Sequence, residues 1–230
     1  MQDKTNNLDD CSTPTGLGIH GGKTKTFRCC TTNETPIMFR GQPLEDVASF
    51  VYLGSLIDKL GGTNMDITKR IQKARAMFLI LRNVWQSRRI SRQTKLRIFR
   101  SNIKSVLLYG SETWRTTKAA MRKLQVFINN CIRRILRIKW SDRVPNRDLW
   151  EMSKQDPVEV EIVRRRWKWI GHTLRKPPTS ITRQALSWNP QGKRGRGRPR
   201  NSWRRDLESD LKSTGYSWAE IATLAKEMNI

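Results

Sequence analysis

The stretch DITKRIQKARAMFLILRNVW, residues Asp66–Trp85, decides the fold together with RQTKLRIFRSNIKSVLLY, residues Arg92–Tyr109. In both, apolar residues recur at intervals of three and four, which places them on one face of a helix. Lys and Arg fill many of the remaining positions, and no Asp or Glu occurs between Ile67 and Ser111. The pattern therefore predicts two helices, each with one face for a core and one cationic face.

The charge of the whole chain points to an anionic partner. Its 230 residues include 45 Lys and Arg against 20 Asp and Glu, for a net charge of +25. Such a charge repels itself in a compact state, so a partner that neutralises it is expected. A solvated surface is the alternative interpretation, but charge of one sign over so long a stretch favours a polyphosphate. We therefore expect RNA, DNA or an RNA–DNA hybrid as the partner.

The sequence gives no sign of a membrane or of secretion. The longest apolar runs, Met77–Leu81 and Val106–Tyr109, are too short to span or insert into a bilayer. Met1–Asp10 is polar and acidic, unlike a secretory signal. We therefore expect an intracellular, nuclear protein without a membrane partner, with its cysteines as reduced thiols. Oligomeric state and protein partners are left open.

The fold class predicted is mainly α with a small β portion near the N-terminus. Residues 1–35 show no periodicity and are expected to be loop with at most one strand. Strands are predicted at Ile37–Phe39 and Phe50–Leu53, with a turn at Gly41–Pro43 between them and an end at Gly54.

Helix-end signals mark the remaining elements. Thr63 with Asp66 and Ser217 with Glu220 resemble capping boxes, and Ser91 and Gly110 stand where the second basic helix should begin and end. A third amphipathic helix is predicted at Lys118–Ile138. Further helices are predicted to begin near Asn146, Asp156–Pro157, Ile181 and Trp203.

Composition suggests four parts. They are a poorly ordered segment (1–35), a hairpin with a helical bundle (36–115), a helical region (116–176), and a terminal helical pair preceded by a basic linker (177–230, with the linker at 191–201).

No catalytic or metal site can be assembled from the residues. Asp9–Asp10 is the one adjacent pair of aspartates, and no second acidic cluster is evident that would complete a two-metal site. Cys11, His20 and Cys29–Cys30 lack the C-x-x-C spacing of zinc ligands. Cys131 occupies an apolar helical position and is expected to pack in a core. We therefore expect no catalytic residue, no metal and no cofactor in this chain.

Two further features have more than one interpretation. Arg196-Gly197-Arg198-Pro199 matches the core of an AT-hook, so these arginines could enter a minor groove, contact phosphates, or stay solvated. Four tryptophans alternate with arginines in the C-terminal half, where core anchoring is favoured over base stacking: Trp167, Trp169, Trp188 and Trp203.

Several segments together resemble one family. They are FVYLGSLIDKLGG, DITKRIQKARAMF, ISRQTKLRIFRSNIKSVLLYGSETWR, CIRRILRIKWSDR, NRDLW, RRRWKWIGHTLRKP and TRQALSWNPQGKRGRGRPRNSWRRDLE. They are similar to the C-terminal part of the endonuclease–reverse transcriptase of RTE-like non-LTR (LINE-type) retrotransposons, an RNA-directed DNA polymerase. The resemblance covers nearly the whole chain.

The resemblance implies roles for particular segments. Gly16–Lys25 is similar to motif D of the palm, with Lys23 as the lysine proposed to assist pyrophosphate release. Phe50–Ser55 is similar to the primer grip, through Phe50, Tyr52, Leu53 and Gly54. Asp66–Trp114 would be the thumb, which clamps the primer–template duplex, and the remainder would be a C-terminal nucleic-acid-binding region.

The family's catalytic aspartates and endonuclease lie upstream of the stretch present here. Asp9–Asp10 lacks the aromatic-Ala dipeptide that precedes the catalytic pair, and Thr26–Thr32 has cysteines where the family has an apolar strand. The chain is therefore expected to be a fragment or degenerate copy, inactive as a polymerase alone, with Mg²⁺ needed only by the catalytic core that it lacks.

The function expected is phosphate-mediated binding of primer–template or target DNA, with little sequence preference. An active endonuclease–reverse transcriptase whose catalytic half lies outside this chain is one alternative. A domesticated adaptor that binds protein through Val158–Arg175 and Ser202–Lys212 is another. The residues expected to contact phosphates are Arg70, Lys73, Arg97, Lys104, Arg134, Arg165, Arg196 and Arg198.

Overall fold

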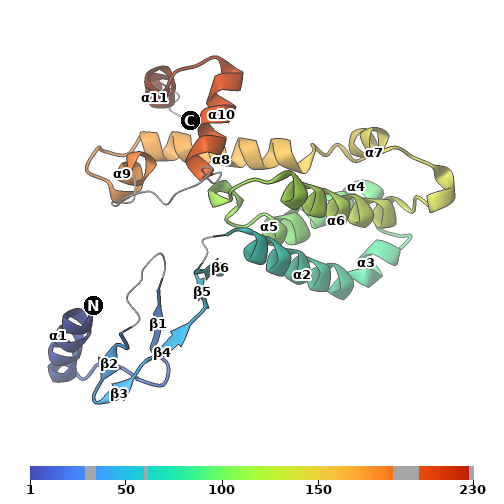
Figure 1. Ribbon diagram of the computed structural model, residues 1–230. Coiled ribbons are helices and arrows are strands. Elements are labelled where there is room, and N and C mark those ends of the chain that lie inside the picture. The colour runs from blue at the N-terminus through green and yellow to red at the C-terminus, as the bar shows by residue number, and fades with distance from the viewer. Residues whose placement is uncertain (29–34, 60–61, 189–201, 228–230) are drawn as a thin grey trace. The chain divides into compact units, whose positions relative to one another are not determined.

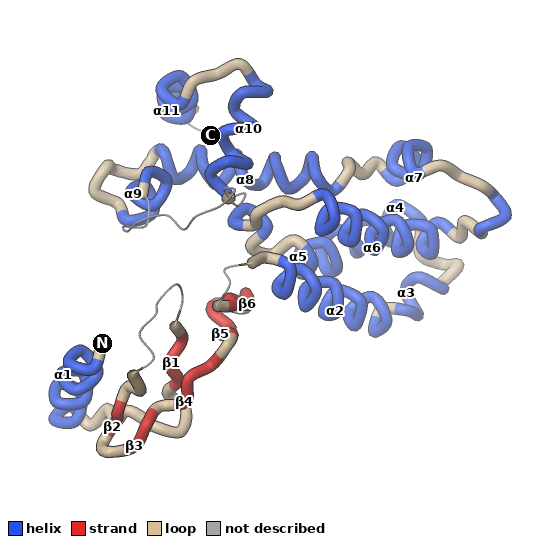
Figure 2. The backbone as a smooth tube through the Cα atoms, in the orientation of Figure 1, coloured by secondary structure: helices blue, strands red, loops and turns tan. Residues whose placement is uncertain are grey.

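The computed structural model describes residues 1–28, 35–59, 62–188 and 202–227 (Figure 1). Helices dominate, and the described strands all precede residue 59 (Figure 2), which confirms the predicted fold class. The chain divides into two compact units, Met1–Asp66 and Ile67–Ile230. The units do not follow the four composition ranges, because residues 36–66 group with the N-terminal segment and everything after Asp66 groups together.

In its described residues, the first unit combines an α-helix and a 3₁₀ turn at Thr13–Thr15 with three pairs of short strands. The strand pairs are β1 with β4, which is parallel, and the antiparallel pairs β2 with β3 and β5 with β6. The parallel pair was not predicted from the sequence. The elements are α1 (Gln2–Ser12), β1 (Lys25–Phe27), β2 (Met38–Phe39), β3 (Gln42–Pro43), β4 (Glu45–Val47), β5 (Ser49–Tyr52) and β6 (Ser55–Asp58).

The predicted strand at Phe50–Leu53 forms a hairpin with β6. Its turn consists of Leu53 and Gly54, whose φ angles are 48° and 83°. Two central residues with positive φ match the twist of the flanking strands in a two-residue hairpin. The side chains of Phe50, Tyr52 and Leu53 are all exposed.

Helix α1 contradicts the expectation of a loop at the N-terminus. None of its residues is buried, so it has no apolar periodicity to detect. It is held instead by polar contacts: the Gln2 amide donates to the Met38 carbonyl (2.7 Å) and accepts from the Met38 N–H (2.8 Å). The Arg40 guanidinium donates two hydrogen bonds to Asp9, and these lower the pKa of that carboxyl. Asp9 is therefore engaged in a structural ion pair.

The second unit is built from helices. The predicted helix at Asp66–Trp85 is interrupted at Leu81, and the one at Arg92–Tyr109 contains a π-helical segment. The elements are α2 (Asn64–Ile80, which begins at the end of the first unit), α3 (Arg82–Gln86), α4 (Arg92–Ile98), the π-helix Phe99–Lys104, α5 (Ser105–Leu107), α6 (Lys118–Leu136), α7 (Asn146–Ser153), α8 (Val158–Leu174), α9 (Ile181–Ser187), α10 (Trp203–Thr214) and α11 (Trp218–Glu227), with 3₁₀ turns at Ser111–Thr113 and Trp140–Asp142.

Several predicted helix ends are confirmed. The Ser91 hydroxyl accepts from the Thr94 N–H (3.1 Å), and Gly110 adopts a left-handed conformation with φ 73°. Ser217 and Glu220 form a reciprocal capping box, in which each backbone N–H donates to the other's side chain.

Helix α6 lies at the centre of the larger core. It packs against α3, α4, α7 and α8, and Figure 1 shows it between α2 and α8. Leu124, Ile128 and Ile132 on its inner face are at most 1% exposed. Phe78 and Trp85 stack with ring centroids 4.9 Å apart, and Phe99 meets Phe78 edge-on. The apolar faces predicted for the three basic helices thus meet in one core.

A smaller core joins α8, α10 and α11. Ile170 and Leu174 of α8 pack with Leu207 and Ala225. Tryptophans surround this core in two close ring pairs, Trp167 with Trp218 and Trp169 with Trp203. Core anchoring of Trp167, Trp169 and Trp203 is thereby confirmed, whereas Trp188 is exposed.

Two buried cations, Lys104 and Arg166, connect α8 to the elements packed against it. The Lys104 ammonium donates to Gln155 (2.9 Å) and forms an ion pair with Glu161. Arg166, only 1% exposed, donates to Asp210 (2.9 Å) and to the Trp114 carbonyl (3.1 Å). Burial raises the pKa of Asp210, and the Arg166 charge opposes that shift.

Replacement of Lys104 by Met should destabilise the protein. The change removes the buried cation that neutralises Glu161 and leaves only the partly exposed Arg165 beside it, so the free energy of unfolding should fall by about 2–4 kcal/mol in urea denaturation. Lys73→Met, at an exposed helical position, is the matched control and should change it by less than about 0.5 kcal/mol. Equal stability of the two variants would contradict the buried role of Lys104.

Cys131 should be protected from alkylation while Cys11 reacts, because Cys131 is buried and Cys11 is exposed. Burial raises the pKa of the Cys131 thiol from 9.0 to about 12. The folded thiol thus keeps a proton that the unfolded thiol releases, and the stability this provides is present below pH 9 and is lost as pH rises toward 12. Peptide mass spectrometry after iodoacetamide treatment at pH 8 should find Cys131 modified only in denaturant; modification in the native protein would refute its burial.

Candidate nucleic-acid interface

A continuous groove runs between α2–α3 on one side and α6 on the other. It consists of three hollows of about 790, 330 and 610 Å³. The first and second share Arg75, Phe127 and Asn130 among their lining residues, and the second and third share Phe78 and Arg134. Because neighbouring hollows share walls, they form one channel, which we call the α2–α6 groove.

The α2–α6 groove is lined by cations from both of its sides. In the part of the chain that the structure describes, no Asp or Glu lines any of the three hollows. The local reason is that neither α2–α3 after Asp66 nor α6 contains an acid. The cations are Arg75, Arg82, Arg88, Lys118, Arg122, Lys123, Arg134 and Arg137.

Apolar side chains form part of the lining between the cations. Phe78 and Trp85 reach the third hollow from α2 and α3, and Ile71, Val126 and Phe127 line the first. The Trp85 indole N–H donates to the Phe78 carbonyl (2.7 Å), which fixes the ring pair. The groove thus combines apolar walls with cationic side chains.

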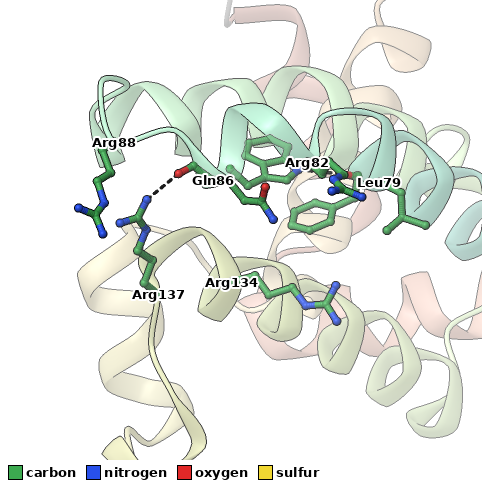
Figure 3. Close-up of a pocket in the computed structure, with 8 residues that line it drawn as sticks. Leu79, Arg82, Gln86, Arg88, Arg134 and Arg137 are labelled. Carbon is green, nitrogen blue, oxygen red and sulfur yellow. Dashed lines mark hydrogen bonds between the residues drawn. The ribbon is translucent and has the colours of Figure 1, made fainter.

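The third hollow has the densest arginine lining. Figure 3 shows Arg88 and Arg137 at one end of it, and Arg82 and Arg134 on facing helices farther along. Arg137 is the C-cap of α6 with φ 60°, a left-handed conformation that is uncommon for a residue with a side chain. From there it donates to the Gln86 carbonyl across the groove (2.7 Å).

At this end of the groove, cations bind the carbonyl end of α3: Lys95 from α4, and Arg137, which bridges the two sides. Lys95 donates to the carbonyls of Trp85 (2.9 Å) and Ser87 (2.5 Å), and Arg137 adds its bond to Gln86. A helix C-terminus attracts positive charge, so these contacts are favourable. Burial, and then the charge of Arg137, lowers the pKa of Lys95.

The predicted phosphate contacts divide into groups. Arg134 lines two of the hollows, as a phosphate-binding residue should. Lys73 and Arg97 are exposed but line none of the three, so their role stays a prediction. Arg196 and Arg198 lie outside the described residues.

Three other predicted contacts face the protein itself. Arg70 is buried, with its guanidinium 4.5 Å from the centre of the Tyr109 ring. Lys104 is buried against Glu161. The expectation that these two cations lie on an exposed face is wrong, because an aromatic ring covers one and an acid from α8 meets the other. Arg165 is half-buried and binds Glu161 (3.1 Å) and the Leu108 carbonyl (3.3 Å).

Sequence reasoning did not select most of the groove cations. Arg75, Arg82, Arg122 and Arg137 stand in the same acid-free, amphipathic stretches as the residues that were chosen. The absence of acids from Lys118–Ile138 was the feature of the sequence that could have identified the groove cations of this helix. The missing information was which helix faces meet.

The residues implied by the resemblance lie in the first unit. Lys23 is exposed in a turn closed by its own N–H donating to the His20 carbonyl (3.0 Å). Phe50, Tyr52, Leu53 and Gly54 form the exposed hairpin described above. Their suggested motif D and primer-grip roles stay predictions.

The described residues contain neither a candidate metal site nor a membrane-spanning helix. Among the described residues, no group of three His, Cys, Asp or Glu side chains could hold a metal ion. In the same residues no helix is long and apolar enough to cross a bilayer.

Comparison with known proteins gives a partial match to a domain family and one informative relative. Residues 77–109, which contain the Phe78–Trp85 pair and the π-helix, match a domain of unknown function, DUF6451. The chain is 27% identical over 229 residues to an uncharacterized transposon-derived protein of Caenorhabditis elegans, covering 92% of this chain and 81% of the relative. No solved structure matches. Over most of its length, the chain is thus similar to a transposon-derived protein.

Proposed function

We propose that this chain binds nucleic acid in the α2–α6 groove, as the thumb and C-terminal part of an RTE-like non-LTR retrotransposon reverse transcriptase. The observation that carries the proposal is a channel lined by eight cations and no described carboxylate. A groove lined by positive charge attracts an anionic partner. Primer–template hybrid and target DNA both present the phosphates that such a surface holds.

The dimensions of the groove suit a polynucleotide strand. Its α2–α3 side runs from Thr68 to Gln86, which at 1.5 Å per helical residue is about 27 Å. Phosphates along one strand rise about 3.4 Å per nucleotide, so about eight nucleotides would span it. The number of cations is therefore comparable with the number of phosphates within reach.

The comparisons support the transposon part of the proposal. The worm relative is described as transposon-derived. The motifs that resemble a reverse transcriptase supply the finer assignment, in which the hairpin of Phe50–Gly54 would serve as primer grip and polymerisation would need a palm supplied elsewhere. A nuclear location is part of the proposal, because target DNA lies there.

The interpretation of the chain as a protein-binding adaptor has less support than the sequence suggested. It relied on tryptophans of α8 and α10 as a protein-binding surface, but Trp167, Trp169 and Trp203 pack around the smaller core. The exposed apolar area that would favour a protein partner is correspondingly reduced.

A triple variant of the groove should weaken binding through the electrostatic contribution. With about six phosphates engaged, wild-type affinity should fall on the order of a thousandfold between 50 and 200 mM salt. Arg75→Gln, Arg122→Gln and Arg134→Gln together should flatten the slope of log affinity against log salt by roughly 2–3, at about 0.9 per lost contact. Fluorescence anisotropy with hybrid, duplex and single-stranded probes measures both quantities.

The matched control removes the same charge from exposed positions that line none of the three hollows. It carries Lys73→Gln, Arg97→Gln and Arg100→Gln. If the groove is the binding site, the control should keep the wild-type slope. An equal effect of the two variants would show that binding follows net charge and not the groove, and a wild-type slope near zero would refute phosphate binding altogether.

A further inference from the structure

Trp140 is the most exposed tryptophan among the described residues and lies outside both cores. Trp140 is 95% exposed, whereas Trp85 and Trp114 are at most 5% exposed. A tryptophan is highly buried on average, because its indole is the largest apolar surface among the side chains. The exposed indole of Trp140 therefore offers a large apolar surface to a ligand.

The turn that carries Trp140 is tightly closed. The Lys139 N–H donates to the Asp142 carboxylate (2.7 Å), and the Asp142 N–H donates back to the Lys139 carbonyl (3.2 Å). The Arg143 N–H donates to the Trp140 carbonyl (3.3 Å). A backbone fixed in this way presents the indole to solvent in advance of binding, which lowers the entropy cost of using it.

Trp140 also lies close to the arginine-rich end of the α2–α6 groove. It follows Arg137, which lines that end, by three residues, and three residues span at most about 10 Å. A strand of about three stacked bases, at 3.4 Å per base, would cover the distance between Arg137 and Trp140. Lys139 and Arg143 flank it with exposed side chains. The acid in the turn, Asp142, is engaged with the Lys139 backbone.

We infer that Trp140 stacks on an unpaired base of a nucleic acid that leaves the groove between Arg88 and Arg137. This inference rests on the proposed function and specifies its ligand: a duplex or hybrid that continues into a single strand. Guanidinium groups bind phosphates in a fixed, bidentate geometry, so they suit the point where the strands separate. An indole offers its face to any base, because every base has a π-face.

The experiment compares two probes that differ only in a single-stranded extension. One is a blunt RNA–DNA hybrid, and the other is the same hybrid with a short oligothymidine overhang. The wild-type chain should bind the overhang probe more tightly. Trp140→Ala should remove that gain, on the order of tenfold, and leave blunt-probe affinity unchanged, whereas Trp140→Phe should keep most of it.

Trp188→Ala is the control, because Trp188 is also exposed (66%) and its loss removes the same side chain elsewhere. It should keep the full gain. A loss in Trp188→Ala equal to that in Trp140→Ala, or no loss in Trp140→Ala, would overturn the inference. Self-association of the wild type that Trp140→Ala abolishes in sedimentation would overturn it too, in favour of a contact between chains. Failure of the proposed function would be distinct, since the wild type would then bind neither probe in a salt-dependent way.

Discussion

The packing of α6 is the interaction on which the second unit depends. Leu124, Ile128 and Ile135 point into the core, and each contributes about 1.5–3 kcal/mol through burial. Because helical periodicity fixes the angle between neighbouring residues, burying these side chains forces Arg122 and Arg134 outward. The same applies to α2, where burial of Ala74 and Phe78 turns Arg75 toward α6. The cationic groove is therefore a geometric consequence of the core, and the apolar burial offsets the repulsion between its two sides.

The distribution of acids explains why that repulsion persists. Glu161 of α8 and Asp210 of α10 meet two of the buried cations, Lys104 and Arg166. A buried charge without a partner would be far more costly than an exposed one, so acids are most effective there. The groove is left without them. Apart from Arg137, which donates to the Gln86 carbonyl, the groove cations are thus separate from the buried charges that hold the helices together. We therefore expect changes at Arg75, Arg122 and Arg134 to have little effect on folding.

The sequence predicted elements best where apolar periodicity was strong. The three amphipathic helices, the Ser91 cap and the Ser217–Glu220 box were anticipated because each depends on residues close together in the chain. Helix α1 was missed because it buries nothing. The site was predicted only in part: the acid-free character of the helices was visible, but among the selected residues that the structure describes, Arg134 alone lines the groove. The π-helix changes the angular position of Lys104 relative to an ideal α-helix, and the cover that Tyr109 provides for Arg70 depends on tertiary structure.

In the proposed complex, the groove and the turn beyond it would recognise nucleic acid by different physical means. Phosphate contacts position a strand without reading its sequence, and stacking on an indole is equally tolerant of the base. Neither discriminates one sequence from another. Their combination would favour a duplex that continues into a single strand, because neighbouring pairs cover the faces of bases inside a duplex, whereas an overhang offers further base faces to the indole. A surface of this composition suits a protein that must hold the junction of a duplex and a single strand whatever the sequence, and such a junction is what a primer annealed to its template presents.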